Sequence, residues 1–393
     1  MDIQEELNIL HGKVLKLYRI FNSMATLEYI FPSSLKKLSI LIVPSFVLFA
    51  WAICVTTVMN TDTQEVTFLY SVIYVGATYQ SIFKFYILFV GHKNEFSELV
   101  KYMDTLTKDG KLKFADNIRK KRLIKSLKIG IFCTNAILSF ININAILLVL
   151  YGISETKCCA MFCKIPEIFL ARDHYLFLPV NLLYGVFAFF VMVEIIIVSD
   201  SFFILILAYF EGQLSAIAEV IQQLDQPEIV ATKSKEIILF IYEAHREALH
   251  HLKIFRGIYW HLNLHVIITI FLYICLLLFM TRYSSASVAT YMGAISSSFQ
   301  LFAICFFGQI LRDRTEAIGD ALYQTRWYDM EQRELKALLI IMANSQRAIG
   351  LDAGGIMDLS FETFASVSNT IFTTRPLPRI QRRVLNVSSR FDL

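Results

Sequence analysis

Five histidines fall within one stretch of 21 residues, and imidazole is the side chain that most often binds transition metals in proteins. They are His245, His250, His251, His261 and His265. His261 and His265 are four residues apart, so on a helix they share a face and offer a workable metal pair. The other three histidines of the chain are isolated, whereas membrane di-iron enzymes carry several such clusters. We therefore interpret the stretch as a hydrated interfacial helix, and we predict no metal, no other cofactor and no catalytic residue.

Two charged residues lie inside otherwise apolar stretches, Lys84 within 66–90 and Glu194 within 176–200. Both stretches are expected to run as helices from the outside of a membrane to the inside. At 1.5 Å per residue, both charges would then lie ~27 Å down, near the cytosolic boundary. Our hypothesis is a Lys84–Glu194 ion pair or a shared aqueous cavity. The alternative is that each side chain extends separately to the lipid headgroups.

Aromatic residues and a few polar ones occupy the expected outer halves of several apolar stretches. They are Tyr70, Tyr74, Asn142, Ile146, Tyr151, Phe177, Asn181, Tyr184, Phe189 and Tyr291. A site for a small apolar ligand combines apolar walls with one or two polar groups that orient the ligand. Ordinary helix packing, or a tyrosine belt at the membrane interface, has the same composition. We treat these residues as candidates for ligand binding.

The elements that must position these residues are membrane-spanning helices. Apolar residues make up 56% of the 393 residues and charged residues only 18%, with a mean hydropathy of +0.54. Soluble domains average about 45–50% and 25%, and a soluble fold of this composition would expose a large apolar patch. Stretches near the 20 or so residues of one crossing are 38–59, 66–90, 127–151, 176–200, 258–280, 286–310 and, more polar than the rest, 353–374. The predicted fold is an all-α polytopic membrane protein with seven transmembrane helices.

The distribution of Lys and Arg predicts the orientation of these helices. The N-terminal segment 1–37 holds five, 91–126 holds ten, 211–257 holds five and 311–352 holds six. The alternate connections 60–65, 152–175 and 281–285 hold none, three and one. We therefore expect a cytosolic N-terminus and, with seven spans, an extracellular C-terminus. The basic tail 375–393, with five arginines, conflicts with the charge rule in that arrangement.

The long segments on the cytosolic side have the composition of helices and not of flexible loops. Segment 1–37 is amphipathic, and in 331–345 the residues Leu335, Leu338, Leu339 and Met342 recur at helical spacing. An apolar stripe on a cytosolic helix requires a packing partner. We expect long cytosolic helical extensions of the spans, with 311–352 forming an anchor segment.

The segment 299–373 resembles the C-terminal signature of insect odorant receptors. The matching pieces are Cys305-Phe306-Phe307-Gly308, Ala321-Leu322-Tyr323, Trp327-Tyr328, Ser345-Gln346, Ala353-Gly354-Gly355 and Leu359-Ser360-Phe361-Glu362-Thr363-Phe364. Several spaced motifs in one order make this resemblance specific, while the rest of the chain matches in topology alone. That topology is inverted relative to G-protein-coupled receptors, which disfavours a metabotropic seven-helix chemoreceptor. The single histidine cluster disfavours a membrane redox enzyme.

The resemblance implies a ligand-gated, non-selective cation channel that assembles as a tetramer in the plasma membrane of sensory neurons. Odorants, which are small volatile hydrophobic molecules, would bind among the outer halves of the second to sixth spans. The seventh helix would line the pore with Asp358, Glu362, Ser366, Asn369 and Thr370. The subunit anchor would include Tyr323, Trp327, Tyr328, Leu335 and Leu339. The partners would be membrane lipid and other subunits, with no role for nucleic acid.

Two further features bear on the type of subunit. Members of the family are mostly tuning subunits that pair with a shared co-receptor, which has an extended loop between the fourth and fifth spans. Here that connection, 211–257, is only 47 residues long, so the chain resembles a tuning subunit. The ending departs from the family, because Pro376 and Pro378 follow Thr374 and would break a continuing pore helix.

Overall fold

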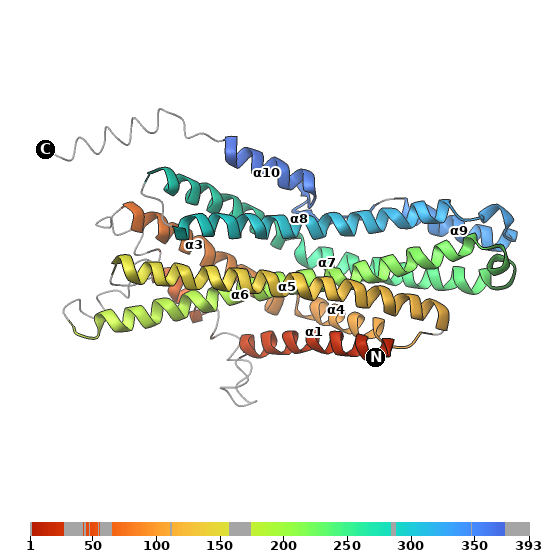
Figure 1. Ribbon diagram of the computed structural model, residues 1–393, viewed down its shortest axis with the longest axis horizontal. Coiled ribbons are helices and arrows are strands. Elements are labelled where there is room, and N and C mark those ends of the chain that lie inside the picture. The colour runs from red at the N-terminus through yellow and green to blue at the C-terminus, as the bar shows by residue number, and fades with distance from the viewer. Residues whose placement is uncertain are drawn as a thin grey trace.

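Long helices lie side by side along one axis in the computed structural model of the chain (Figure 1). The structure describes residues 2–26, 42, 45–46, 48–53, 55, 65–110, 112–156, 174–283, 288–346 and 348–373. Most of the first expected span, 38–59, and the whole basic tail, 375–393, lie outside these residues. The fold that positions the candidate site is therefore the one formed from residue 65 onward.

Four helices of this bundle are far longer than a single membrane crossing. The helices before residue 324 are α1 (Ile3–Thr26), α3 (Glu65–Tyr86) with the π turn η2 (Ile87–Gly91), α4 (Lys93–Leu106), α5 (Lys113–Thr156), α6 (Phe177–Gln222) with the 3-10 turn η3 (Gln223–Asp225), α7 (Pro227–Tyr283) and α8 (Val288–Tyr323). Among the described residues, five helices are long and apolar enough to cross a membrane. The α5, α6, α7 and α8 helices have 44, 46, 57 and 36 residues, against the 20 or so that one crossing requires. The prediction that the intervening segments are helical is confirmed for these extensions.

The α6 helix forms the centre of the bundle, and 78% of its apolar window is buried. The α5 and α6 helices approach each other closely at two glycines, one on each helix. A Cβ atom on Gly130 would lie 2.8 Å from the Cβ of Ala208, and one on Gly212 would lie 2.9 Å from the Cδ2 of Leu123. Small residues allow two helix backbones to approach in this way, and the Ser126 hydroxyl then donates to the Ala208 carbonyl at 2.6 Å.

The chain after α8 forms a short hairpin before its last helix. The elements are the 3-10 turn η4 (Trp327–Asp329), α9 (Gln332–Ser345), strands β1 (Asp352–Ala353) and β2 (Met357–Asp358), and α10 (Phe361–Thr373). Strands β1 and β2 are antiparallel, and Gly354 and Gly355 make the turn with φ of 63° and 69°. Positive φ favours glycine and is incompatible with a right-handed helix. The prediction of a helix over 353–374 is therefore wrong at its start, because α10 begins at Phe361.

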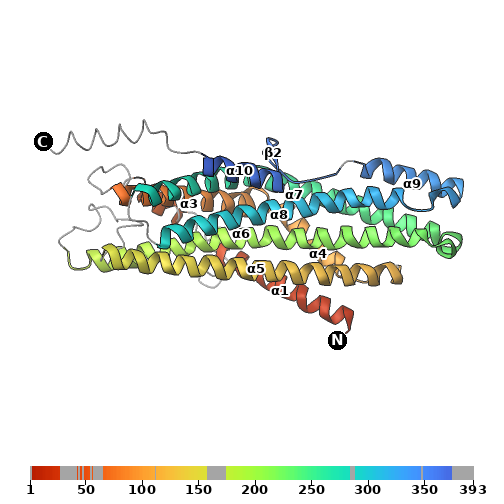
Figure 2. The same ribbon diagram turned by 45° about the horizontal axis from the view of Figure 1, so that its top comes forward.

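The hairpin fastens α10 to the bundle through α7 and α8. The Gly354 amide donates to the Trp260 carbonyl at 3.0 Å, and Arg256 pairs with Asp352 at 2.6 Å. On α8, Gly308 lies directly beneath Leu359, where an added Cβ would be 2.6 Å from the Leu359 Cβ. Figure 2 shows α10 lying alongside α8. The end of α10 that follows the hairpin is thus held by direct contacts with both long helices.

Candidate functional site

A cavity of about 160 Å³ lies among five helices of the bundle. Its walls come from α3 (Ile73, Tyr74, Ala77, Gln80), α5 (Ile141, Asn144, Ala145, Leu148), α6 (Phe189, Met192, Val193, Ile196), α7 (Tyr273, Leu277) and α8 (Gly293, Ser296, Ser297, Gln300). The spacing of three and four residues within each set places those side chains on one face of their helix. The cavity is smaller than the roughly 300–1,000 Å³ of sites for drug-sized ligands. It suits a ligand of low molecular weight.

Three polar atoms at the cavity have no hydrogen-bond partner among the described residues. They are the Gln80 side-chain nitrogen, the Asn144 side-chain oxygen and the Tyr273 hydroxyl. Gln80 and Asn144 are only 2% and 5% exposed. The other side of the Asn144 amide donates to Ser296 at 3.0 Å, which fixes its orientation. Buried polar groups are costly to leave unsatisfied, so this arrangement favours a ligand or water that supplies hydrogen-bonding groups.

The cavity is connected to a buried ion pair through Gln300. The Lys84 side chain has no solvent-exposed surface and its ammonium donates to the Asp200 carboxylate. The second oxygen of Asp200 accepts a hydrogen bond from the Gln300 amide. The hypothesis of a Lys84–Glu194 pair is therefore wrong, and Asp200 is the partner. Glu194 and Asp200 are six residues apart, so at ~100° per residue they point about 120° away from each other around α6.

The predicted ligand-binding residues separate into those that face the cavity and those that do not. Tyr74 and Phe189 line it. The Asn181 side chain is buried but donates to the Phe177 carbonyl at 2.8 Å, and Tyr184 packs against Phe46. The remaining candidates are exposed or half-buried residues away from the cavity wall, with Ile146 at 48%, Tyr291 at 52% and Asn142 half-buried. The side chains of Tyr70 and Tyr151 lie outside the described residues.

Sequence reasoning missed the residues that give the cavity its polarity. Gln80 lies six residues after Tyr74, and Asn144 lies two residues after Asn142, about 200° around α5. Tyr273 lies within the long apolar stretch 258–280, where no sequence pattern distinguishes it from residues of ordinary helix packing. Its ring lies against Gly76, where an added Cβ would be 3.2 Å from a ring carbon. Gln80 shares a helix face with Ile73, seven residues earlier, but points about 120° away from Tyr74, so a search along the face of Tyr74 would have found neither Gln80 nor Tyr273.

The α10 helix has one polar and one apolar face. Glu362, Ser366, Asn369 and Thr370 are exposed at positions i, i+4, i+7 and i+8, which share a face. The opposite side packs on the bundle through Phe364, Val367 and Ile371. Asp358 is not on this helix, because it lies in β2 and pairs with Arg312 at 3.0 Å. The predicted pore-lining set thus falls into one helical stripe and one residue of the hairpin.

The predicted anchor residues lie at the end of the bundle formed by α8 and α9. Tyr323, Tyr328 and Leu339 are 70%, 66% and 50% exposed, and Ile340 beside them is 57% exposed. Trp327 and Leu335 are half-buried, whereas Leu338 is fully buried against the bundle. The α9 helix therefore has apolar residues on two sides, and one side is not covered by any residue that the structure describes.

The comparisons with known proteins agree with this architecture. The family model described as 7tm Odorant receptor matches residues 65–372. Odorant receptor 2a of Drosophila melanogaster is 37% identical over 68 residues, which is 17% of each chain. Odorant receptor Or2 of Anopheles gambiae is 26% identical over 147 residues, 36% of this chain and 38% of the relative. These alignments span less than half the length of the curated relatives.

The solved structures match over nearly the whole chain. The insect olfactory receptor OR5 from Machilis hrabei in complex with eugenol superimposes with a TM-score of 0.76 at 13% identity, covering 95% of this chain and 98% of that one. A second structure of OR5 from Machilis hrabei gives a TM-score of 0.73 at 11% identity. The fold is therefore the multi-pass membrane fold of these olfactory receptors. With the family model matching most of its length, this chain belongs to the insect odorant receptor family.

Proposed function

We propose that this chain is the odorant-binding subunit of a ligand-gated, non-selective cation channel. The observation that carries the proposal is the cavity among α3, α5, α6, α7 and α8, with apolar walls and a few unpaired polar atoms. Such a site suits a small volatile hydrophobic molecule that carries one hydroxyl or carbonyl group. The similarity to OR5, whose structure was solved in complex with eugenol, supports a small-molecule ligand.

The orientation that follows places the cavity in the outer half of the membrane. The excess of Lys and Arg in 1–37, 91–126, 211–257 and 311–352 supports a cytosolic N-terminus. The continuous extensions of α5, α6, α7 and α8 then lie in the cytosol. With seven spans across the plasma membrane, the last of which contains α10, the C-terminus is extracellular.

The polar stripe of α10 is the proposed lining of the central pore. Glu362, Ser366, Asn369 and Thr370 are exposed on a single chain, and polar side chains that face hydrocarbon are costly, most of all the charged one. A water-filled path shared by several subunits would hydrate them, and the carboxylate of Glu362 favours cations. Asp358, paired with Arg312 at the start of this segment, is proposed as a charged residue at the inner end of the path.

Subunit contacts are proposed at the cytosolic end of the bundle. The exposed side chains Tyr323, Tyr328, Leu339 and Ile340 form an apolar surface on α8 and α9, and Trp327 and Leu335 lie at its base. Tyrosine, tryptophan and leucine of this kind are well suited to a buried protein interface. We place the other subunits of a tetramer, including the shared co-receptor, on this surface.

The proposed route from ligand to pore runs along α8. Gln300 lines the cavity, and two and six residues further along α8 the rings of Phe302 and Phe306 pack on α10. The Phe302 ring centroid is 5.4 Å from that of Phe364, and the Phe306 centroid is 5.9 Å from that of Phe361. A ligand that shifts α8 would therefore move α10 directly.

The decisive test is whole-cell current from cells that express this chain with the family's co-receptor, across a panel of volatile compounds. Cells with the co-receptor alone, and with this chain alone, are the controls. Odorant-evoked cation current that requires both chains and persists without added G-protein is the expected result. Surface expression of both chains without any evoked current would contradict the proposal, and current that requires a G-protein would support a metabotropic receptor instead.

A further inference from the structure

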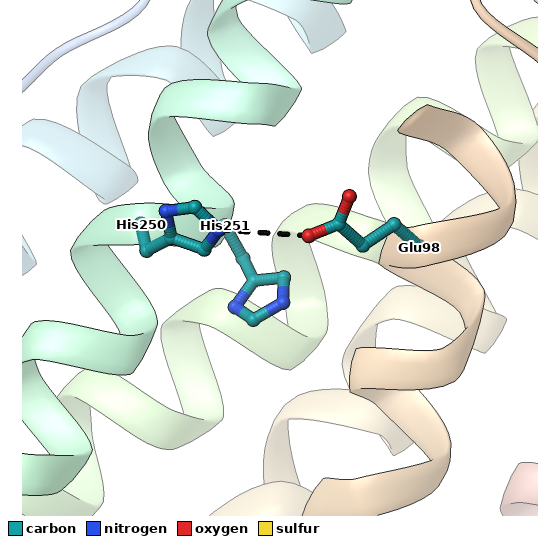
Figure 3. Close-up of side chains that lie close together, drawn as sticks. All are labelled: Glu98, His250 and His251. Atoms are coloured by element: carbon teal, nitrogen blue, oxygen red, sulfur yellow. Dashed lines mark ion pairs between the residues drawn. The ribbon is translucent and has the colours of Figure 1, made fainter. Parts of the chain in front are cut away.

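A cluster of three metal-binding side chains lies far from the ligand cavity. Glu98 on α4 and His250 and His251 on α7 each offer one ligand atom, and these atoms all lie within 4.8 Å of one another. Figure 3 shows the carboxylate of Glu98 and the two rings turned toward a common space between the helices. It is the only such group of three or more among the residues that the structure describes. The function proposed above does not use it.

One separation within the cluster is close to that between two ligands of a coordinated ion, and none exceeds 4.8 Å. The Nε2 atom of His250 lies 3.5 Å from the Glu98 carboxylate. Two ligand atoms on a tetrahedral Zn²⁺, with bonds of about 2.0–2.1 Å, are roughly 3.3 Å apart. Glu98 and His250 are exposed and His251 is half-buried, so small side-chain rotations can bring all three to an ion at little cost. Two imidazoles and one carboxylate form a ligand set that suits Zn²⁺ and Cu²⁺.

The ring of His251 is already oriented for coordination. Its Nδ1 atom lies 2.9 Å from the backbone carbonyl of Glu247, so in the tautomer that donates there Nε2 has a free lone pair. Metal-binding histidines usually make this kind of second hydrogen bond. The ring also stacks on Tyr102 of α4, with centroids 4.0 Å apart and planes at 8°. Burial raises the pKa of Tyr102, so its ring remains a neutral platform for the imidazole.

The charges around the cluster favour a cation. The surface depression beside His250 is formed with Glu243, Glu247 and Arg246. Together with Glu98 this gives three carboxylates against one guanidinium, and that guanidinium lies 5.4 Å from the centre of the Tyr242 ring. The exposed ion pair of His250 with Glu98 by itself contributes little to stability.

The pair that sequence spacing favoured does not form such a cluster. His265 packs against Phe83, with ring centroids 3.9 Å apart, and against Tyr79. His261 is exposed beside Trp260. The third ligand of the observed cluster comes from a helix about 150 residues earlier in the chain, which no local motif would reveal.

We propose that Glu98, His250 and His251 bind one divalent transition-metal ion, with water completing its coordination. The ion joins α4 to the N-terminal half of α7, the helix that also carries Tyr273 at the cavity and the contacts to the β1–β2 hairpin. Metal occupancy therefore fixes the cytosolic part of α7 against its neighbour. This inference stands independently of the ligand and the pore.

The test uses the purified full-length protein and Zn²⁺ alone. Competition with a chromophoric chelator measures the affinity for wild type and for the variants E98Q, H250A and H251A. One bound ion per chain is expected, with the affinity of each variant lower by about tenfold or more, because even indirect supports of metal ligands are worth 10–100-fold. The control is H261A, an exposed histidine of the same helix that is outside the cluster.

A second readout separates loss of the site from loss of the fold. Zn²⁺ should raise the unfolding temperature of wild type and H261A but not of E98Q. Without Zn²⁺, E98Q should unfold at the wild-type temperature, because Glu98 is an exposed surface residue. Equal Zn²⁺ affinity in wild type and all three ligand variants, or no binding to wild type at millimolar Zn²⁺, would overturn the proposal.

Discussion

The two ends of the helix bundle are packed in different ways. At the end formed by α1, α4 and the extensions of α5–α8, buried apolar residues form one continuous cluster that reaches to α9 and α10. Ion pairs tie its helices together, such as Lys128 to Glu6 at 2.6 Å and Arg314 to Glu211 at 3.0 Å. Around the cavity, a separate and smaller cluster centres on Tyr74, Phe189 and Ile197.

This difference separates a scaffold from an adaptable site. The scaffold end has interlocking side chains and charges that hold the long helices in register, so its residues tolerate little change of volume. The cavity end has empty volume and unpaired polar atoms, so side chains there can change at a smaller cost in stability. Stability should therefore depend mainly on the scaffold end and on the boundary between the two, and ligand preference on the cavity end.

The largest effect is expected where the two regions meet, at Lys84. Lys84→Met leaves the buried Asp200 carboxylate without its cation, which should lower the free energy of unfolding by about 3–5 kcal/mol. Thermal unfolding of the detergent-solubilised protein measures this loss. The double variant K84M/D200L should recover a large part of it, because no charge remains buried. If the double variant is no more stable than K84M, the pair does not have the stated role.

A smaller loss is expected from Gly308→Ala in the scaffold. The added Cβ would lie 2.6 Å from both the Cβ and the carbonyl oxygen of Leu359, so α8 and the hairpin must separate at a cost of about 1–3 kcal/mol. Gly257→Ala is the matched control, because a Cβ there meets no atom within 4 Å. The measurement is again thermal unfolding, and an equal change in both variants would refute the close contact.

Tyr273→Phe should change ligand response with little change in stability. The Tyr273 hydroxyl has no partner among the described residues, so its removal should alter the free energy of unfolding by less than about 0.5 kcal/mol. For odorants that carry a hydroxyl or carbonyl group, the half-maximal concentration should rise by roughly two- to tenfold. Tyr291→Phe, an exposed residue outside the cavity, should leave it unchanged. Equal responses in the two variants would exclude Tyr273 from the ligand site.

The smallest effect is a pH dependence in the scaffold. His245 lies in the part of α7 that precedes the expected span, and burial lowers its pKa below the ordinary value. The unfolded chain then binds the proton more readily than the folded one, so stability is lost as the pH falls through the ordinary histidine value of about 6.5. His245→Leu should reduce this loss in unfolding temperature between about pH 7.5 and pH 5.5. H261A should retain it, and a variant that behaves like H261A would contradict the assignment.

Hydropathy and motifs predicted the helices more accurately than they predicted the contacts between helices. Long apolar stretches identified α3, α5, α6, α7 and α8, because lipid-facing helices must be apolar for about 20 residues. The family signature singled out Gly308, and the structure gives the reason in its contact with Leu359. The prediction of Glu194 as the partner of Lys84 rests on depth in the membrane alone. It ignores the direction in which each side chain points around the helix axis. Asp200 lies on the required face and Glu194 does not.

The start of α10 and the metal cluster were missed for other reasons. The sequence signature contains Gly354-Gly355 but does not indicate that both have positive φ, so the predicted helix begins too early. Glu98 meets His250 and His251 only because α4 folds back beside α7, which is a property of the tertiary structure. Local patterns specify elements and faces, but contacts between distant segments depend on how those faces combine.

The exposed polar stripe of α10 has a consequence for the biosynthesis of the receptor. In the proposed arrangement, a single chain in a bilayer would present the carboxylate of Glu362 and three further polar side chains to lipid, at a cost of several kcal/mol for the charged group. Assembly into the proposed channel would remove this cost, because the stripes of neighbouring chains would then enclose water. A lone subunit thus differs from an assembled one in what surrounds the polar face of α10. That helix can serve quality control in the secretory pathway as a marker of unassembled subunits.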